Sequence, residues 1–141
     1  REIIRENIIN EQMNNQVSDE PKFGQKVQIL KLKYFNNNNL NNSNKDKSGL
    51  IMFYAPWCPH CTRMIPTLNN LSESLDQDRM SLNKGFVGAV NCTEEENLGT
   101  RMGISGYPTL KVFKKVRNMG DYPGSRDESE LKNYIMQLLR N

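Results

Sequence analysis

The chain has few of the residues that build disulfide-stapled, metal-bound or membrane-spanning proteins. It contains 3 cysteines, 1 histidine and 1 tryptophan in 141 residues. Three cysteines are too few for a framework of several disulfides, and a structural zinc site needs four ligands. No stretch approaches the roughly 18 consecutive apolar residues of a transmembrane helix, so we expect no membrane segment in this chain.

The chain also lacks a large excess of positive or negative charge. It has 19 Lys and Arg and 16 Asp and Glu, which gives a net charge of +3. No basic stripe is interleaved with aromatic residues, so we expect no binding to nucleic acid. The length corresponds to about one domain. The chain opens on Arg1 without a signal-peptide pattern. We therefore expect a segment of a longer protein, with targeting signals outside it.

The scarce residues gather in one short stretch. Residues 53 to 61 read Phe-Tyr-Ala-Pro-Trp-Cys-Pro-His-Cys and hold two cysteines with the only tryptophan and histidine. The apolar run at residues 50 to 54 predicts a strand buried on both faces of a sheet. Apolar residues at spacings of three and four then predict a helix over residues 62 to 77. Cys58 is therefore expected at the amino end of a helix.

This position favours a thiolate, because a helix begins with unpaired N–H groups and the positive end of its dipole. We expect the pKa of Cys58 to lie well below the free value of about 8.5, so that Cys58 attacks disulfides near neutral pH. Cys61, one helical turn later, would resolve the mixed disulfide. His60 can carry a positive charge that stabilises the Cys58 thiolate, which would make the pair a stronger oxidant.

Two other readings of this cysteine pair compete with the redox one. The pair can be half of a zinc site, but only Cys92 and His60 remain as further ligands, so we expect no metal. The pair can be an inert disulfide, but so short a loop stabilises little. We interpret Cys58 and Cys61 as a redox-active centre that needs no other cofactor. Cys92 fits a small buried residue, with an extra redox or intermolecular thiol as the alternative.

The stretch from Phe53 to Cys61 resembles the active site of thioredoxin-fold domains of the protein disulfide isomerase family. Three further motifs follow in the family's order. They are Pro66, where the family kinks its active-site helix, the Gly-Tyr-Pro-Thr of residues 106 to 109, and the Tyr-Pro-Gly-Ser-Arg of residues 122 to 126. The resemblance covers about residues 25 to 141. It implies an α/β fold, a thioredoxin-like three-layer α/β/α sandwich around a central mixed sheet.

The resemblance also implies a client-binding surface. Pro108 corresponds to the cis-proline that faces the dithiol, with a trans turn as the alternative. Tyr107 before it would offer backbone hydrogen bonds to a client chain. Trp57, Ile104 and Tyr107 would form an apolar rim that receives unfolded clients. Arg126 corresponds to an arginine that lowers the pKa of the second cysteine.

Some positions depart from the family or leave a role open. Arg126 can instead be a surface arginine paired with Glu128 or Glu130. Pro59 replaces the glycine usual in the isomerases, and Cys-Pro-His-Cys resembles the DsbA-type bacterial oxidants, which favours disulfide donation. Met52 and Ala89 stand where the family commonly has a buried acid and a lysine. Without that acid, we expect slower deprotonation of Cys61 and slower release of clients.

The amino-terminal part is predicted to be irregular. Residues 1 to 24 form a polar extension, either a frayed tail or a short amphipathic helix. Residues 27 to 32 predict the first strand. Residues 36 to 48 are rich in asparagine and predict a surface loop with at most a short helix.

The carboxyl-terminal part shows clear periodicity. Residues 85 to 90 predict a second buried strand, and Thr93 predicts the cap of a helix over residues 94 to 102 that ends at Gly103. Residues 109 to 113 and 116 to 122 predict an antiparallel pair. A last helix is expected to start at Asp127, which with Glu130 resembles a capping box. The basic cluster at the turn, formed by Lys114, Lys115 and Arg117, is expected to be a solvated edge.

Together these features predict a thiol-disulfide oxidoreductase that donates disulfides to folding protein clients or isomerises them. Glutathione or another redox partner would recharge the dithiol. Persistent disulfides need an oxidising compartment, so the resemblance places the protein in the endoplasmic reticulum or another secretory compartment. Two alternatives remain: a thioredoxin-like disulfide reductase, and a client-binding chaperone module in which the dithiol is secondary.

Overall fold

The computed structural model describes residues 22–41, 46–81 and 83–140. Its main element is a five-stranded mixed sheet in the order β1-β5-β4-β6-β7. Strands β1, β5 and β4 are parallel, β6 is antiparallel to β4, and β7 is antiparallel to β6. The strands of this sheet are β1 (Gln28–Ile29), β4 (Ser48–Tyr54), β5 (Gly85–Asn91), β6 (Thr109–Lys114) and β7 (Arg117–Asp121). The helices are η1 (Leu32–Tyr34), α2 (Pro59–Gln77), α3 (Glu96–Arg101) and α4 (Glu128–Arg140).

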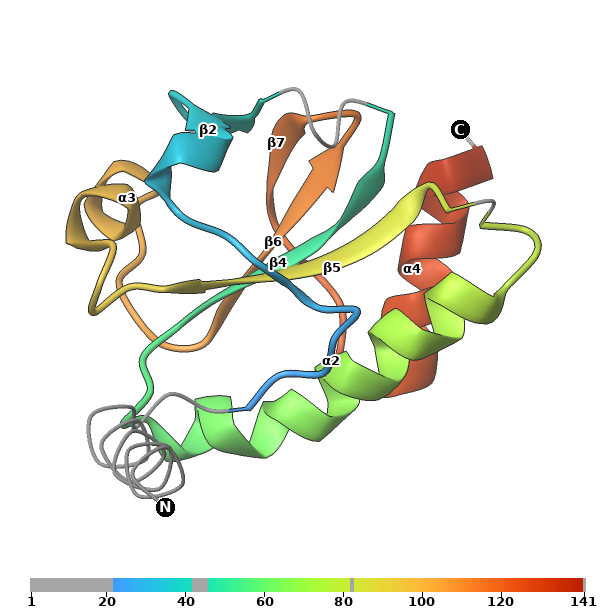
Figure 1. Ribbon diagram of the computed structural model, residues 1–141, viewed down its shortest axis with the longest axis horizontal. Helices are drawn as coiled ribbons and strands as arrows, with labels where there is room; N and C mark the ends of the chain where they lie inside the picture. Colours follow the sequence, from blue (N-terminus) through green and yellow to red (C-terminus); the bar gives the residue numbers. More distant parts are fainter. Residues whose placement is uncertain (1–21, 42–45, 82, 141) are drawn as a thin grey trace, which may run out of the picture.

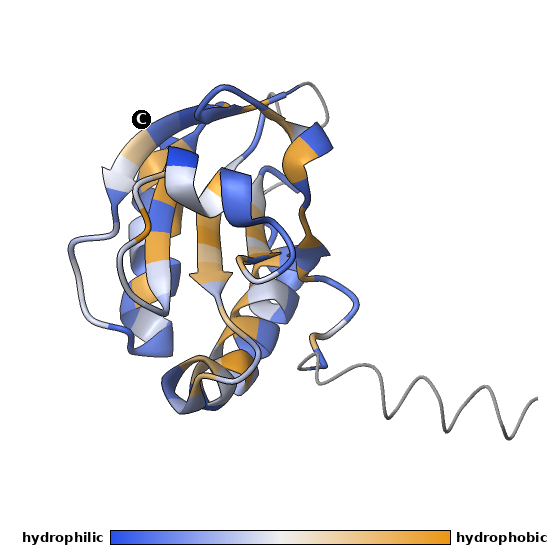
Figure 2. Ribbon diagram, turned by 90° about the vertical axis from the view of Figure 1, so that its left-hand side faces the viewer, coloured by the Kyte–Doolittle hydropathy of each residue, from blue (hydrophilic) through white to orange (hydrophobic). Residues whose placement is uncertain are grey.

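Helices cover both faces of the sheet, which confirms the predicted α/β/α sandwich. Helices α2 and α4 lie on one face, while α3 and a small hairpin of β2 (Phe35–Asn36) and β3 (Asn39–Leu40) lie on the other (Figure 1). Apolar residues, orange in Figure 2, concentrate in the strands between these layers. Within the described parts of the chain, no helix combines the length and apolar character needed to span a bilayer.

The central strand β4 explains why its sequence is apolar without alternation. All of its residues are buried, and successive side chains point to opposite faces. Leu50, Met52 and Tyr54 pack with α2 and α4, whereas Ile51 and Phe53 pack with α3 and the hairpin. We call these two cores the dithiol-side core and the hairpin-side core.

A glycine near the start of β4 permits the close pairing of the central strands. A Cβ atom on Gly49 would lie 1.9 Å from the carbonyl oxygen of Phe86 on β5. Because that neighbour is backbone, it cannot move aside, and any side chain here would separate β4 from β5.

The amino-terminal segment differs from the prediction. The first strand covers only Gln28–Ile29 rather than residues 27 to 32. The Leu32 N–H instead donates to Glu95 Oε1 at 2.9 Å, and a 3-10 turn begins there. Phe23 is half-buried and stacks edge-on against Tyr54, with ring centroids 5.3 Å apart, so the packed domain includes this residue. Residues 1 to 21 of the extension predicted over residues 1 to 24 lie outside the described residues.

The asparagine-rich tract forms a hairpin where a loop or short helix was predicted. Phe35 pairs with Leu40 and both are buried, so this short hairpin covers the hairpin-side core. Asn37 in its two-residue turn has φ +58°, a conformation that asparagine tolerates better than most residues. The hairpin is tied to the sheet through the Leu40 N–H, which donates to the Val116 carbonyl at 2.9 Å. Residues 42–45 lie outside the described part.

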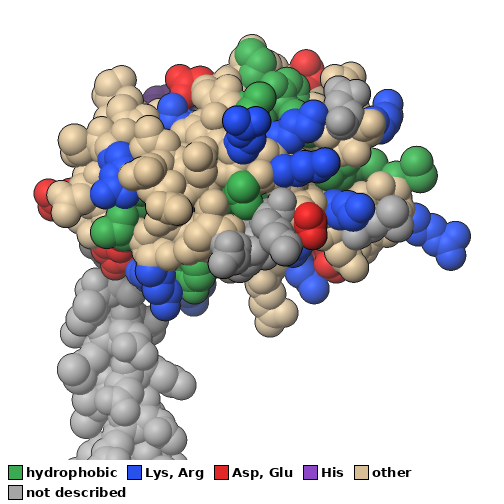
Figure 3. All heavy atoms as spheres, turned by 90° about the horizontal axis from the view of Figure 1, so that it is seen from above, with side chains coloured by type: hydrophobic (Ala, Val, Ile, Leu, Met, Phe, Trp, Pro, Cys, Tyr) green, Lys and Arg blue, Asp and Glu red, His purple; other side chains and the backbone are tan. Residues whose placement is uncertain are grey.

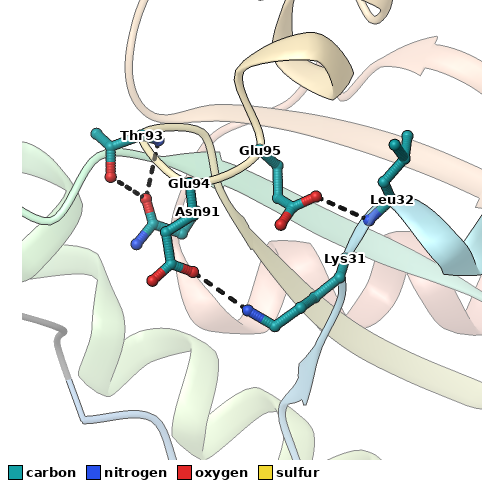
Figure 4. A network of polar contacts seen from close by, with 6 residues as sticks. All are labelled: Lys31, Leu32, Asn91, Thr93, Glu94 and Glu95. Atoms are coloured by element: carbon teal, nitrogen blue, oxygen red, sulfur yellow. Dashed lines mark hydrogen bonds and ion pairs between the residues drawn. The ribbon is translucent and has the colours of Figure 1, made fainter.

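Helix α3 begins later than predicted, and Thr93 does not cap it. Thr93 donates through its N–H and its hydroxyl to Asn91 Oδ1, at 2.9 and 2.6 Å (Figure 4). Glu94 pairs with Lys31 at 3.2 Å, and Glu95 accepts the Leu32 amide, so these acids hold the amino-terminal segment against the sheet (Figure 4). The helix therefore spans only Glu96–Arg101. Its predicted end is confirmed, because Gly103 adopts φ +71° just beyond it.

The remaining predictions for the carboxyl-terminal part hold with small changes. Strands β6 and β7 form the expected antiparallel pair, and β7 is an edge of the sheet. Lys115 and Arg117 are exposed at this edge, and Figure 3 shows Lys and Arg side chains (blue) gathering on this end of the molecule. At the start of α4, Glu130 Oε2 accepts from the Ser125 hydroxyl at 2.8 Å, a contact that differs from the predicted capping box.

Candidate active site

The two cysteines lie where the chain leaves β4 and enters α2. The Cys58 N–H donates to the Ala55 carbonyl at 3.1 Å and closes the turn after the strand. Pro59 follows as the first helical residue, where the missing amide of proline costs nothing. Cys58 is therefore the N-cap residue of the 19-residue helix α2, as the sequence predicted.

The surroundings of Cys58 favour its thiolate. The backbone N–H of Cys61 lowers the pKa of Cys58 most, and the Cys61 side chain, the His60 amide and the Arg63 charge lower it further. Burial acts in the opposite direction, but the net effect is a pKa below the ordinary value. Amides at the first turn of a helix stabilise an anion in this way.

Cys61 has the opposite character. It is fully buried, and burial is the largest cause that raises its pKa to about 11. The neighbouring Cys58 raises it further, while the Ala55 backbone and the charge of Arg126 lower it. The surroundings therefore favour the thiolate at Cys58 and the protonated thiol at Cys61. All three cysteines are free thiols in this structure.

The segment around Pro108 faces the dithiol, although it lies far away in the sequence. The Tyr107–Pro108 peptide bond is cis. The Cys58 thiol donates to the Tyr107 carbonyl at 3.7 Å, so this backbone lies directly beside the reactive sulfur. Trp57 is 69% exposed and contacts the Tyr107 ring edge-on at 5.8 Å. Ile104 is half-buried against the hairpin-side core.

Arg126 is held close to the same segment. The Tyr122 hydroxyl donates to the Ser125 carbonyl at 2.7 Å and shapes the loop before α4. Arg126 Nη2 then donates to the Pro108 carbonyl at 3.1 Å, and its charge acts on Cys61. Glu130, a partner considered for this arginine, accepts a hydrogen bond from Ser125 instead.

Sequence reasoning did not single out Arg63. Its Nε donates to the Pro59 carbonyl at 3.4 Å, and its charge lowers the pKa of Cys58. The sequence spacing could have indicated it, because Arg63 follows Pro59 by four residues and so lies on the same side of the helix as the start of the active-site turn. His60 is exposed next to Cys61 in the first turn of α2.

Comparison with known proteins fits this geometry. Residues 26–137 match the protein-family model described as Thioredoxin. The chain belongs to the thioredoxin family. Among its relatives are the protein disulfide-isomerase of Humicola insolens, 36% identical over 88 residues, and protein disulfide-isomerase 1 of Dictyostelium discoideum, 37% identical over 91 residues. These matches cover 62% and 63% of this chain but only 16% and 24% of the relatives, so the chain spans less than a quarter of their length.

A solved structure agrees with these relatives. The first thioredoxin domain of mouse protein disulfide-isomerase A4 superimposes with a TM-score of 0.67 at 30% identity, over 85% of this chain and 80% of that domain. This chain is therefore a thioredoxin domain homologous to those of the protein disulfide isomerases, as the sequence motifs predicted.

Two buried apolar residues face each other on the central strands of this thioredoxin domain. Met52 on β4 and Ala89 on β5 lie directly opposite each other in the parallel pair, and both are fully buried. The resemblance described above predicted that relatives have a buried acid and a lysine at these two positions. Their register explains why both charges can be absent together, since one buried charge without the other would be costly.

Cys92 lies apart from the dithiol in this thioredoxin domain. It is buried in the hairpin-side core, and burial raises its pKa to about 11. Among residues 22–41, 46–81 and 83–140, no cluster of His, Cys, Asp and Glu is arranged to hold a metal ion.

Proposed function

We propose that this domain is a thiol-disulfide oxidoreductase that donates disulfides to protein clients or isomerises them. The observation that carries the proposal is the unequal pair of thiols in one helical turn. The pKa of Cys58 lies below its ordinary value, whereas the pKa of Cys61 is about 11. A disulfide exchange centre needs this division between an exchanging sulfur and a resolving one.

In the oxidised domain, Cys58 and Cys61 form the disulfide that is donated. A client thiolate attacks the Cys58 sulfur, the Cys58–Cys61 bond breaks, and Cys61 leaves as a thiolate that takes up a proton. A second client thiolate then attacks the client sulfur of the mixed disulfide. The client gains a disulfide and loses two electrons, while the domain is left as the dithiol. A low pKa at Cys58 makes its thiolate a good leaving group.

In the reverse direction the Cys58 thiolate attacks a client disulfide and releases one client thiolate. Cys61 then loses its proton and attacks the Cys58 sulfur, which frees the client in reduced form. His60 and the helix terminus are proposed to stabilise the Cys58 thiolate. Arg126 is proposed to support ionisation of Cys61, because its charge lowers the pKa of that thiol.

The proposed client surface adjoins Cys58. Tyr107, whose carbonyl lies beside the reactive sulfur, would align the client backbone next to Pro108. Trp57 would offer apolar contact area, because it is largely exposed. Ile104 would extend this surface. The clients are expected to be unfolded or partly folded polypeptides with thiols or disulfides.

The proposal extends to the recharging partner and the compartment. Glutathione disulfide or another redox partner would reoxidise the dithiol. Because protein disulfides persist only in oxidising surroundings, we expect the protein to act in the endoplasmic reticulum or another secretory compartment. The homology to disulfide isomerases supports this expectation.

The deciding experiment is equilibration of the Cys58–Cys61 pair with a glutathione series, read by thiol alkylation and by Trp57 fluorescence. A potential of roughly −120 to −180 mV, the span from the bacterial oxidant to the isomerases, supports donation and isomerisation. A value near −270 mV, like that of thioredoxin, would make the domain a reductase. A Cys58→Ser, Cys61→Ser double variant that still suppresses aggregation of a reduced client would favour the chaperone reading.

A further inference from the structure

A surface pocket of about 240 Å³ adjoins the dithiol, and its polar side chains are cationic or neutral. It is lined by His60, Arg63, Met64, Thr67 and Arg126. None of the described acidic side chains lines it. The two arginines come from α2 and from the loop before α4, so the pocket exists only in the folded domain.

Both guanidinium groups are positioned by backbone carbonyls near Cys58. Arg63 Nε donates to the carbonyl of Pro59, the residue after Cys58. Arg126 Nη2 donates to the carbonyl of Pro108, the residue after the one whose carbonyl contacts the Cys58 sulfur. Each guanidinium carries five N–H donors, so several remain for a further partner. Arginine groups fixed in this way suit bidentate binding of a carboxylate.

Neither arginine is neutralised within the described part of the chain. The ion pairs found there involve lysines and their carboxylate partners, and neither Arg63 nor Arg126 belongs to them. The carboxylates nearest in sequence to Arg126 have other contacts. Asp127 accepts from the Ser129 hydroxyl, and Glu130 accepts from the Ser125 hydroxyl.

We propose that this pocket binds an acidic side chain of the client, a few residues from the cysteine that reacts with Cys58. The domain would therefore exchange disulfides faster with acid-flanked cysteines than with neutral or basic ones. The inference rests on the proposed oxidoreductase function and names the client feature that the site selects. Met64 and Thr67 complete the lining, so the two arginines and His60 are the lining side chains that carry or can carry a positive charge.

The test uses the reduced chain and three synthetic peptides that share one cysteine and differ only in flanking Glu, Gln or Lys. The peptide cysteine carries a chromophoric aryl thiol as a mixed disulfide. The Cys58 thiolate attacks the peptide sulfur, a Cys58–peptide disulfide forms, and the coloured aryl thiolate leaves. Each rate is divided by the rate of a small neutral thiolate with the same peptide, which removes intrinsic differences among the peptides.

The wild-type chain is expected to prefer the Glu peptide over the Gln peptide by about two- to fivefold, as for an exposed ion pair. Added salt should reduce this ratio. Arg63→Gln should lower the ratio toward one, and Arg63→Glu should invert it in favour of the Lys peptide. The ratio of the two peptide rates is compared, because the loss of Arg63 also changes the pKa of Cys58 and would alter both rates alike. Arg79→Gln, an equal loss of charge at an exposed site beyond the far end of α2, should keep the preference.

Equal normalised rates for the Glu and Gln peptides would overturn the pocket's role and leave the oxidoreductase function intact. An equal loss of preference in Arg63→Gln and Arg79→Gln would also overturn it, because net charge would then explain the effect. Glutathione disulfide offers carboxylates on a small molecule. If Arg63→Gln slows only its reaction and leaves the peptide ratio unchanged, a preference for acidic clients is wrong. No reaction of Cys58 with any peptide would refute the proposed function itself.

Discussion

Cys61 and Cys92 are both buried thiols, and burial raises the pKa of each to about 11. Cys61 belongs to the dithiol-side core and Cys92 to the hairpin-side core, on opposite faces of one sheet. Only Cys61 lies one helical turn from a thiol whose pKa is lowered. Burial raises the pKa of both thiols. Only Cys61 can take part in disulfide exchange with Cys58, because it lies one turn away on α2.

The two faces of the sheet are also built differently. A 19-residue helix carries the dithiol on one face, with Pro59 at its first position. The other face is covered by the six-residue α3 and by a hairpin held through contacts such as the Asn118 N–H to Asn39 Oδ1, 2.9 Å. The turn between β6 and β7 there has positive φ at Lys115 and Val116, +49° and +70°. We expect changes in α2 to affect catalysis and stability, and changes in α3, the hairpin and the β6–β7 turn to affect stability alone.

The sharpest test of this comparison replaces each buried thiol in turn. Cys61→Ser should reduce turnover with a client disulfide by at least about 1,000-fold, because the mixed disulfide at Cys58 cannot be resolved within the domain. Cys92→Ser should retain turnover within about twofold. Turnover assays and mass spectrometry of trapped mixed disulfides measure both effects. A large loss of turnover in Cys92→Ser would place this thiol in the redox cycle.

Equal burial on the two faces predicts equal stability losses. Leu68 on α2 and Leu98 on α3 are both fully buried. Leu68→Ala and Leu98→Ala should each lower the free energy of unfolding by about 2–5 kcal/mol, measured by urea denaturation. If Leu98→Ala costs less than about 1 kcal/mol, the α3 side opens independently of the sheet.

The absent buried acid offers a test within the dithiol-side core. Since the pKa of Cys61 is about 11, the resolving step should accelerate about tenfold per pH unit as pH rises from 7 towards that value. Met52→Glu should speed this step about tenfold at neutral pH and flatten its pH dependence, because a carboxylate can accept the proton. It should also destabilise the fold through burial of the charge.

Met52→Gln is the matched control, since it has nearly the same shape and cannot accept the proton. Rapid-mixing kinetics of mixed disulfide decay separate the resolving step from the first attack. An unchanged turnover in Met52→Glu would count against a role for this position in the release of clients.

The smallest expected effect lies at the strained turn of the other face. Lys115→Gly should raise the free energy of unfolding by about 0.5–1 kcal/mol, because glycine adopts positive φ without the steric cost paid by lysine. Lys115→Ala removes the same exposed side chain and keeps that cost, so it should show no gain. Urea denaturation measures the difference, and turnover should be unchanged in both variants. A change in turnover would contradict the expectation that changes at this turn affect stability alone.

The regular elements and the reactive pair could be predicted because their signals are local. The run from Leu50 to Tyr54 is apolar because β4 is buried on both faces, and the stripe along α2 has helical spacing because one side of it packs on the sheet. The position of Cys58 at the start of that helix follows from these two patterns. The sequence therefore determined the sandwich and the location of the dithiol.

Only the tertiary structure decided the features that depend on contacts between distant segments. Glu95 accepts the Leu32 amide and shortens both the first strand and α3, while the asparagine tract becomes a hairpin because Leu40 bonds to Val116. Arg63 and Arg126 meet at one pocket although no periodicity links them. Hydropathy periodicity records which side of a segment is buried. It does not indicate which carbonyl or carboxylate from a distant segment a side chain will contact.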